Sequence, residues 1–530
     1  MSRRIEEAAQ IIGIHLDFKG VMFKPRYVPQ LFADLADQGV NTVLVEYEDL
    51  FPFEGIDVAA DPSVCFTRAS LKRFLTAARR NGIDVIPLQQ CLGHLEYVYR
   101  WKRYDRGALD VKYPSTLDLS KPKARGQIRE MLRQVVEAHP DSRYVHLGLD
   151  EARLTPPGHD ASDADVIRTF VDYATELIEF VEQYDKTPML WTDMLQDHFR
   201  PGPIKAFAAL KDRVVFMPWD YQARERDYTP VGRVCGFRTS RTWLDEAEDP
   251  HAPALADGAR FLEDLPADVK RLIKPFSKGR LVRTLPEVDL FSRMGFRIVG
   301  ATTVRFSSEG PILPNYNHLH GNIRAWSSAI RRNRQMGLIA TSWARGTTFC
   351  PPNFRIDLTW PSIAVLAAVS GKKAKPFWPG VPTRTVRRLA AQIGRCKVDW
   401  SIERQIIDEM TALRPRLKAH RHEWDSILLM VRVLQLRKWL DAVIDEVDYF
   451  HANHRPNPHE WQRRLNDQAD ALQQIAAMRH EVQTHFARRY HGQAFDEWVT
   501  DLFDHQETRI KEARIVSRRK KQLAARAYRA

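Results

Sequence analysis

The segment ADQGVNTVLVEY, residues 36–47, decides the fold of this chain. It contains the polar end of a helix, then Gly39, and then a run of β-branched and apolar residues typical of a buried strand. Because glycine readily adopts the left-handed conformation that ends a helix, the segment predicts a helix followed almost at once by a strand. The same joint recurs at residues 79–89 (RRNGIDVIPLQ), 292–302 (SRMGFRIVGAT) and 334–343 (RQMGLIATSW).

Four further apolar runs bring the candidate strands to eight. They are IIGIHLD (11–17), RYVHLGL (143–149), TPMLWTD (187–193) and RVVFMPW (213–219). Helical patterns lie between the strands, as in residues 27–37, 70–80 and 164–183. Eight strands alternating with helices predict an α/β fold, a TIM (β/α)₈ barrel with its active site at the carboxyl ends of the strands. The seventh strand is expected near residues 297–301.

The hydrophobic period becomes helical from about residue 372 onward. Trp424, Ile427, Leu428 and Val431 follow i, i+3, i+4, i+7 spacing, and a second long helix is expected over residues 459–488. The sequence therefore predicts two units. They are a (β/α)₈ catalytic domain over 1–371, with a long insertion at about 222–296, and an all-helical C-terminal domain over 372–530.

Composition and charge exclude several classes of protein. Hydrophobic residues make up 44% of the 530 residues and charged residues 28%, which excludes a collagen-like or wholly disordered chain. The net charge is +13, but nine Lys and Arg against one acid fall in a basic tail, residues 509–530. That tail accounts for eight of the thirteen charges, so we favour a solvated helical extension over nucleic-acid binding.

Other features of the sequence point to a cytoplasmic protein. No apolar run of transmembrane length is present, and the N-terminus lacks the apolar core of a secretory signal, so no membrane partner is expected. The five cysteines contain no C-x-x-C pair and read as reduced packing residues. No clustered metal ligands are apparent, so we predict no metal and no cofactor. The helical region is a candidate surface for a homodimer.

The strongest chemical signal is YVHLGLDEARL, residues 144–154, in which a strand ends at Asp150 and Glu151. Neighbouring residues at a strand end point in different directions, which favours separate duties for the two acids. The alternative is that Asp150 caps a helix with Glu151 in its first turn. Tryptophans stand at three other strand ends, and a tryptophan face suits the apolar face of a sugar ring. They are Trp191, Trp219 and Trp343.

The motif HLGLDE, residues 146–151, resembles the H-x-G-x-D-E signature of glycoside hydrolase family 20, the β-N-acetylhexosaminidases. Further segments are similar, in order, to the hexosaminidase D-like branch of that family, over about residues 10–370. They are GIHLDFKG (13–20), VEYEDLFPFEG (45–55), VIPLQQCLGHLEYV (85–98), LWTDM (190–194), PWDY (218–221) and the pair Trp343 and Arg345.

The resemblance implies a retaining exo-β-N-acetylhexosaminidase that releases a terminal β-linked GalNAc or GlcNAc, without distinguishing the two. In this family the 2-acetamido group of the substrate attacks the anomeric carbon, so no enzyme nucleophile is needed. Glu151 is implied as the acid and then the base, with its pKa raised by partial burial or a neighbouring acid. Asp150 is implied to hold the acetamido N–H, and Tyr221 to donate to the acetamido oxygen.

The resemblance also implies supporting roles around the sugar. His94 would link the acid to a second carboxylate, either Glu46 or Glu48, and the three tryptophans would wall the sugar. The remaining substrate-binding candidates are Asp17, Asp220 and Arg345. Asp17 has the alternative of an ion pair with Lys19, and both Asp193 and Asp220 could be caps, with Asp220 ranked ahead of Asp193 for contact with substrate.

The chain departs from the family pattern in three places, one of which is ARGTTFCPPN (344–353), where the hexosaminidase D-like branch has a polar, aromatic run after the last-strand tryptophan. Leu149 stands where the broader family has glycine, and the first strand lacks an arginine for the sugar 3- and 4-hydroxyls. These departures concern the end of the site that would bind the 3-, 4- and 6-hydroxyls and leave the acetamido end intact. Two other functions stay open. One is a two-carboxylate glycosidase for a non-acetylated sugar, using Glu151 with Asp220 or Glu46. The other is a non-catalytic barrel that binds carbohydrate or nucleic acid.

Overall fold

The computed structural model describes residues 10–527 except 157, 160–161, 198–207, 209, 230–232, 235–236, 239–266, 280, 308, 372–374, 397–400 and 454–456. Much of the expected insertion at 222–296 therefore lies outside the described residues. Its described part includes a small antiparallel sheet, β11 (Ser277–Lys278), β12 (Leu281–Arg283) and β8 (Tyr228–Thr229). Within the described part of the chain, no helix is both long and apolar enough to cross a membrane.

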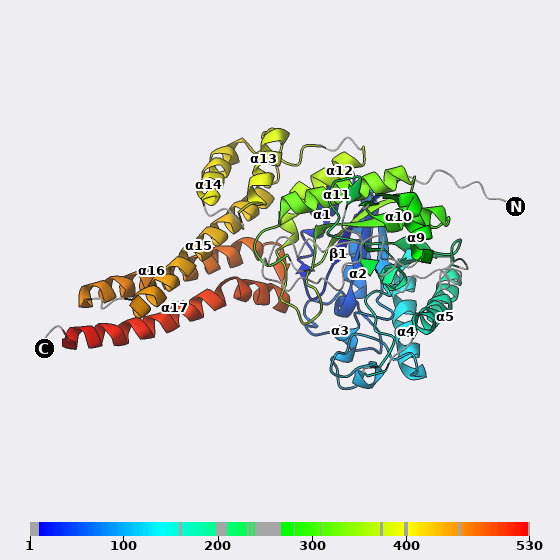
Figure 1. Ribbon diagram of the computed structural model, residues 1–530, viewed down its shortest axis with the longest axis horizontal. Coiled ribbons are helices and arrows are strands. Elements are labelled where there is room, and N and C mark those ends of the chain that lie inside the picture. The colour runs from blue at the N-terminus through cyan, green and yellow to red at the C-terminus, as the bar shows by residue number, and fades with distance from the viewer. Residues whose placement is uncertain are drawn as a thin grey trace.

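Eight parallel strands close into a barrel, so the predicted fold class is confirmed (Figure 1). All eight expected segments supply strands. In barrel order they are β1 (Ile11–Asp17), β3 (Thr42–Glu46), β4 (Asp84–Leu88), β5 (Tyr144–His146), β6 (Thr187–Trp191), β7 (Val215–Met217), β13 (Arg297–Arg305) and β14 (Gly337–Ser342), which returns to β1. The seventh strand begins where it was expected and continues four residues further.

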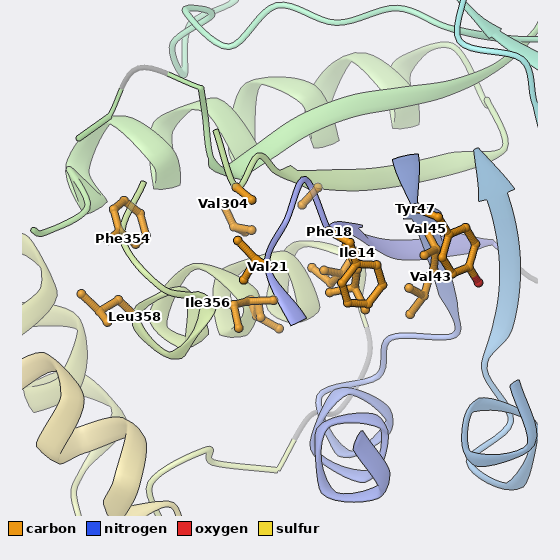
Figure 2. Packing of buried hydrophobic residues seen from close by; sticks show 14 of the residues in the cluster. Ile14, Phe18, Val21, Val43, Val45, Tyr47, Val304, Phe354, Ile356 and Leu358 are labelled. Atoms are coloured by element: carbon orange, nitrogen blue, oxygen red, sulfur yellow. The ribbon is translucent and has the colours of Figure 1, made fainter. Parts of the chain in front are cut away.

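Alternating side chains divide the core into two layers. Val43 and Val45 of β3 belong to the outer layer, between the strands and the helices, where Figure 2 shows them with Tyr47. Leu44, between them in sequence, points the other way and belongs to a separate cluster inside the barrel. Because successive strand residues face opposite sides, a strand buried on both faces is apolar along its middle, as Val43, Leu44 and Val45 of β3 are.

Helices cover the outside of the barrel (Figure 1). The longer ones lie close to their predicted ranges, and α2 starts at a capping box in which Thr67 and Ser70 exchange hydrogen bonds. The helices of this unit are α1 (Val28–Asp37), α2 (Arg68–Arg80), α3 (Glu96–Tyr99), α4 (Pro122–Ala138), α5 (Asp163–Glu182), α6 (Asp193–Asp197), α9 (Ala267–Ile273), α10 (Pro286–Arg293), α11 (Tyr316–Arg332) and α12 (Trp360–Val369).

Three of the four predicted glycine joints have the expected left-handed backbone. Gly39, Gly82 and Gly295 have φ values of +78°, +66° and +86°. Gly337 differs, because α11 ends five residues earlier and Arg334, with φ +52°, takes the left-handed conformation. Gly337 instead opens β14, where an added Cβ would lie 2.1 Å from the carbonyl oxygen of Ile11, so glycine is needed for close strand approach.

The C-terminal region is helical, as predicted, and its last three helices form an elongated arm that projects from the barrel (Figure 1). Its helices are α13 (Thr383–Ile393), α14 (Ile402–Leu413), α15 (Arg421–Asn453), α16 (Pro458–Phe486) and α17 (Gln493–Ala527). The boundary expected near residue 371 adjoins undescribed residues and stays a prediction.

The arm is joined to the barrel by a strand pair and a buried ionic cluster. Between α16 and α17, β15 (Tyr490–His491) pairs with β2 (Met22–Phe23), which follows the first barrel strand. Arg489 lies 2.5 Å from Asp357 and also contacts Glu423, and both of these acids are buried. A buried guanidinium held by carboxylates from both units fixes their relative position.

Candidate active site

The acid pair follows β5 at the carboxyl end of the barrel, on a strained turn. Leu149 and Glu151 have φ values of +73° and +46°, a region that costs a non-glycine residue about 1–3 kcal/mol. Leu149 thus adopts the conformation suited to the glycine that the broader family has there. Its side chain is fully buried, and that packing offsets part of the strain.

The two acids have different surroundings, as their adjacent positions predicted. The side chain of Asp150 is 6% exposed and that of Glu151 is 57% exposed. Among the described residues, Asp150 Oδ1 is buried without a hydrogen-bond partner. Glu151 is thus partly covered and adjoins a second acid, whereas Asp150 is buried and keeps an oxygen able to accept a hydrogen bond.

His94 links the two acids. Its Nε2 atom lies 3.3 Å from Asp150 Oδ2 and 3.3 Å from Glu151 Oε2. Burial alone would lower the pKa of His94, but the two carboxylates raise it well above its ordinary value, which favours an imidazolium. The preceding Gly93 permits this approach, because a Cβ there would lie 2.1 Å from the carbonyl oxygen of Asp150.

Glu46 and Glu48, the expected partners of His94, surround Lys19 instead. Lys19 Nζ lies 3.2 Å from Glu46, 3.3 Å from Asp17 and 3.6 Å from Glu48, and all four side chains are buried. Burial alone would lower the pKa of Lys19, but the three carboxylates raise it well above its ordinary value. A buried ammonium needs such partners, which explains why these acids surround Lys19. His94 instead contacts Asp150 and Glu151.

Asp17 and Glu46 are consequently bound within the protein. Asp17 accepts hydrogen bonds from the backbone N–H groups of Lys19 and Ala344, at 3.1 and 2.8 Å. Glu46 also lies 3.3 Å from His15 Nε2, and its pKa is lowered because Lys19 and His15 outweigh the effect of burial. The predicted ion pair between Asp17 and Lys19 is present.

The three tryptophans gather at the same end of the barrel. The rings of Trp191 and Trp343 are 6.1 Å apart, and Trp219 stacks on Tyr221 at 5.3 Å. Trp343 donates its indole N–H to the hydroxyl of Tyr221 at 2.9 Å. The four rings are therefore in contact with one another, but Trp191 is fully buried in the cluster inside the barrel and Trp343 is nearly so, whereas Trp219 and Tyr221 are partly exposed.

The remaining candidates are held by other parts of the protein. Asp220 accepts hydrogen bonds from the backbone N–H groups of Gln222 and Ala223, as in the capping alternative. Arg345 is nearly buried and donates to the carbonyl oxygen of Thr348 and to Glu497 of α17.

Asp193, ranked behind Asp220 from sequence, lies closer to the acid pair. Its Oδ2 atom accepts a hydrogen bond from the backbone N–H of Glu151 at 2.7 Å, and its Oδ1 atom accepts one from Trp219 Nε1 at 3.3 Å. His15 was not singled out, although it precedes Asp17 by two residues and therefore shares its face of β1. That alternation was the available signal for His15.

One group of side chains among the described residues has the spacing of metal ligands. Asp34, His420 and Glu423 each offer an atom within 4.8 Å of the others. They lie at the junction with the arm, and Glu423 already binds the guanidinium of Arg489, whose charge opposes a cation. Asp150, Glu151 and His94 do not belong to this group.

An eight-stranded parallel barrel with adjacent carboxylates and several tryptophans at its strand ends is the arrangement typical of (β/α)₈ glycoside hydrolases. Sequence comparison confirms the resemblance to hexosaminidase D-like proteins that the motifs indicated. The chain is 29% identical to hexosaminidase D of Bos taurus over 219 residues, which is 40% of this chain and 62% of that protein. It is 28% identical to hexosaminidase D of Homo sapiens over 240 residues, 42% of this chain and 48% of that protein.

The matched region thus spans about half to three fifths of these relatives. No protein-family model matches the chain. Among solved structures, the GH20 β-N-acetylhexosaminidase from Streptomyces coelicolor A3(2) matches 72% of this chain and 67% of its own, at 14% identity and a TM-score of 0.43.

Proposed function

We propose that this protein is a retaining exo-β-N-acetylhexosaminidase that uses the 2-acetamido group of its substrate as the nucleophile. The observation that carries the proposal is the contrast within the acid pair. Glu151 is largely exposed, while Asp150 is buried with an oxygen that no described donor satisfies. The similarity to hexosaminidase D supports the same chemistry.

The two members of the pair have different roles in this mechanism. Glu151 protonates the departing glycosidic oxygen and then removes a proton from the attacking water. Asp150 accepts the acetamido N–H and stabilises positive charge on that nitrogen while the acetamido oxygen bonds to the anomeric carbon. His94, as an imidazolium, orients both carboxylates. A sugar seated over Glu151 would exclude water from its carboxyl group.

The surroundings of other carboxylates favour this mechanism over a two-carboxylate glycosidase. The second acid of that alternative would be Asp220 or Glu46. Asp220 caps its own turn, and Glu46 is buried against Lys19 and His15. A retaining enzyme of that type needs a carboxylate free to form a covalent bond with the sugar, about 5 Å from the acid.

A panel of aryl β-glycosides that differ at C2 and C4, assayed with Glu151→Gln beside the wild type, tests the proposal. We expect hydrolysis only of the 2-acetamido sugars, and a loss of kcat by about 10²–10⁴-fold in the variant. Glu512→Gln, an exposed change of the same type, is the control. Equal turnover of sugars with and without the acetamido group would favour the two-carboxylate mechanism, and near wild-type activity of Glu151→Gln would overturn the assignment of the acid. The C4 pairs report the preference between GalNAc and GlcNAc.

We place the protein in the cytoplasm and take the N-acetylhexosaminide as its partner, with no nucleic acid bound by the basic tail. Fractionation of cells tests the location. Salt-dependent binding of DNA or RNA that is lost when the chain is cut after Thr508 would overturn the second statement.

A further inference from the structure

The arm contacts the candidate site through an ion pair between Glu497 and Arg345. Arg345, two residues after Trp343, donates from Nη2 to Glu497 Oε2 of α17 at 3.0 Å. Its Nη1 donates to the carbonyl oxygen of Thr348 at 3.2 Å. The side chain of Arg345 is 8% exposed and that of Glu497 is 40% exposed, so the arginine lies under the rim and the glutamate partly covers it.

Glu497 is held firmly against the barrel. The next residue, Trp498, is fully buried and donates its indole N–H to the carbonyl oxygen of Pro311 at 2.9 Å. Ala494, one turn earlier, is buried where the chain passes Gly20, and a Cβ on that glycine would lie 3.3 Å from its side chain. Gln493 donates to the other carboxylate oxygen of Glu497 at 2.9 Å. A side chain with both oxygens bound, on a docked helix, can hold a partner in position.

Arg345 lies in the segment 343–348, which also contains Trp343 of the proposed sugar wall. Trp343 contacts Tyr221 through its indole N–H, and Lys19 Nζ lies 4.6 Å from the centre of its ring. The backbone N–H of Ala344 donates to Asp17. The segment is thus fixed to the barrel on one side and to α17 on the other.

We infer that Glu497 is a positioning residue, which acts through Arg345 to hold the wall around Trp343 in its sugar-binding geometry. The helical arm is then part of the substrate-binding site and not a separate module. This inference rests on the proposed function, because it assigns Trp343 to the wall around an N-acetylhexosamine.

The test compares Glu497→Gln with Asp496→Asn in the full-length protein, using an aryl N-acetyl-β-hexosaminide. Asp496 is the exposed neighbour on the same helix, so its variant matches the loss of charge. A wall that contacts the sugar equally in the ground and transition states affects binding, so we expect KM to rise by roughly tenfold in Glu497→Gln with kcat nearly unchanged. Asp496→Asn should keep both values.

A double-mutant cycle shows whether Glu497 acts through the arginine. In an Arg345→Met background, Glu497→Gln should have no further effect on KM. The inference is overturned if Glu497→Gln behaves like Asp496→Asn, if the two effects multiply independently, or if only the melting temperature falls while KM stays constant. Failure of the wild type to hydrolyse the glycoside would instead overturn the proposed function itself.

Discussion

The carboxylate of Asp193 accepts a hydrogen bond from the backbone N–H of Glu151 at 2.7 Å. Glu151 has a φ of +46°, so its backbone is held in a conformation that a non-glycine residue seldom adopts. The bond joins the ends of β5 and β6, and it fixes the direction in which the carboxyl of Glu151, the proposed acid, leaves the main chain.

Removal of this bond should slow catalysis without removing any reacting group. In Asp193→Ala we expect kcat to fall by about tenfold to a hundredfold, because a small misplacement of the acid is costly. Steady-state kinetics on an aryl N-acetyl-β-hexosaminide provide the measurement. Asp212→Ala, at an exposed position, is the control, and an unchanged kcat in Asp193→Ala would contradict the positioning role.

The raised pKa of His94 predicts a pH-dependent contribution to stability. A group whose folded pKa lies above its unfolded value of about 6.5 stabilises the fold fully below that pH, and this contribution declines as pH rises toward the folded pKa. The unfolding free energy lost in His94→Gln should therefore be larger at pH 6 than at pH 9. Chemical denaturation at the two pH values measures it, with exposed His505→Gln as the reference. A loss that grows with pH would contradict the ion pairs with Asp150 and Glu151.

Lys19→Met should destabilise the protein by about 3–5 kcal/mol at neutral pH, because it leaves the buried carboxylates of Asp17 and Glu46 without their cation. In the wild type the pKa of Glu46 is lowered, so the stability gained from its ionised form is present above about pH 4.5 and is lost as the pH falls. The deficit of the variant should shrink toward pH 4. Urea denaturation checks this against Lys72→Met, an exposed lysine of α2, and a deficit independent of pH would refute it.

Tyr221→Phe should lower kcat for 2-acetamido substrates by roughly 10²-fold, because it removes the proposed donor to the acetamido oxygen while keeping the ring that stacks on Trp219. Binding of a thiazoline analogue of the cyclised intermediate should weaken in parallel, as calorimetry can measure. Tyr113→Phe, a change at an exposed loop tyrosine, should alter neither value. Tight thiazoline binding by Tyr221→Phe would exclude the donor role.

The barrel could be predicted because local patterns carry it. A glycine after a helix and an apolar run after the glycine are both read within a dozen residues, and β3 is the clearest case. Gly337 misled the prediction, because a glycine required for strand contact has the same sequence signal as one that ends a helix. Strand β13 continues through polar residues to Arg305. An apolar pattern does not predict this polar part of the strand.

The sequence predicted which residues lie at the strand ends. It predicted less well which of these residues contact one another. The acid pair and His94 meet as their positions implied. Ranking Asp193 against Asp220 required knowledge of which carboxylate faces the neighbouring strand, and that depends on backbone turns beyond the strand ends. Similarly, the preference of Glu46 for Lys19 over His94 follows from burial, which the spacing of residues does not express.

The strand pair that joins β2 to β15 has a consequence for biosynthesis. Arg489, beside β15, contacts Tyr27 across 462 residues of chain. At a ribosomal rate of about 5–20 residues per second, the beginning of the barrel emerges roughly 25–90 seconds before the segment that covers it. The edge of β2 stays unpaired over that interval, and an unpaired strand edge is open to incorrect pairing until β15 has been synthesised.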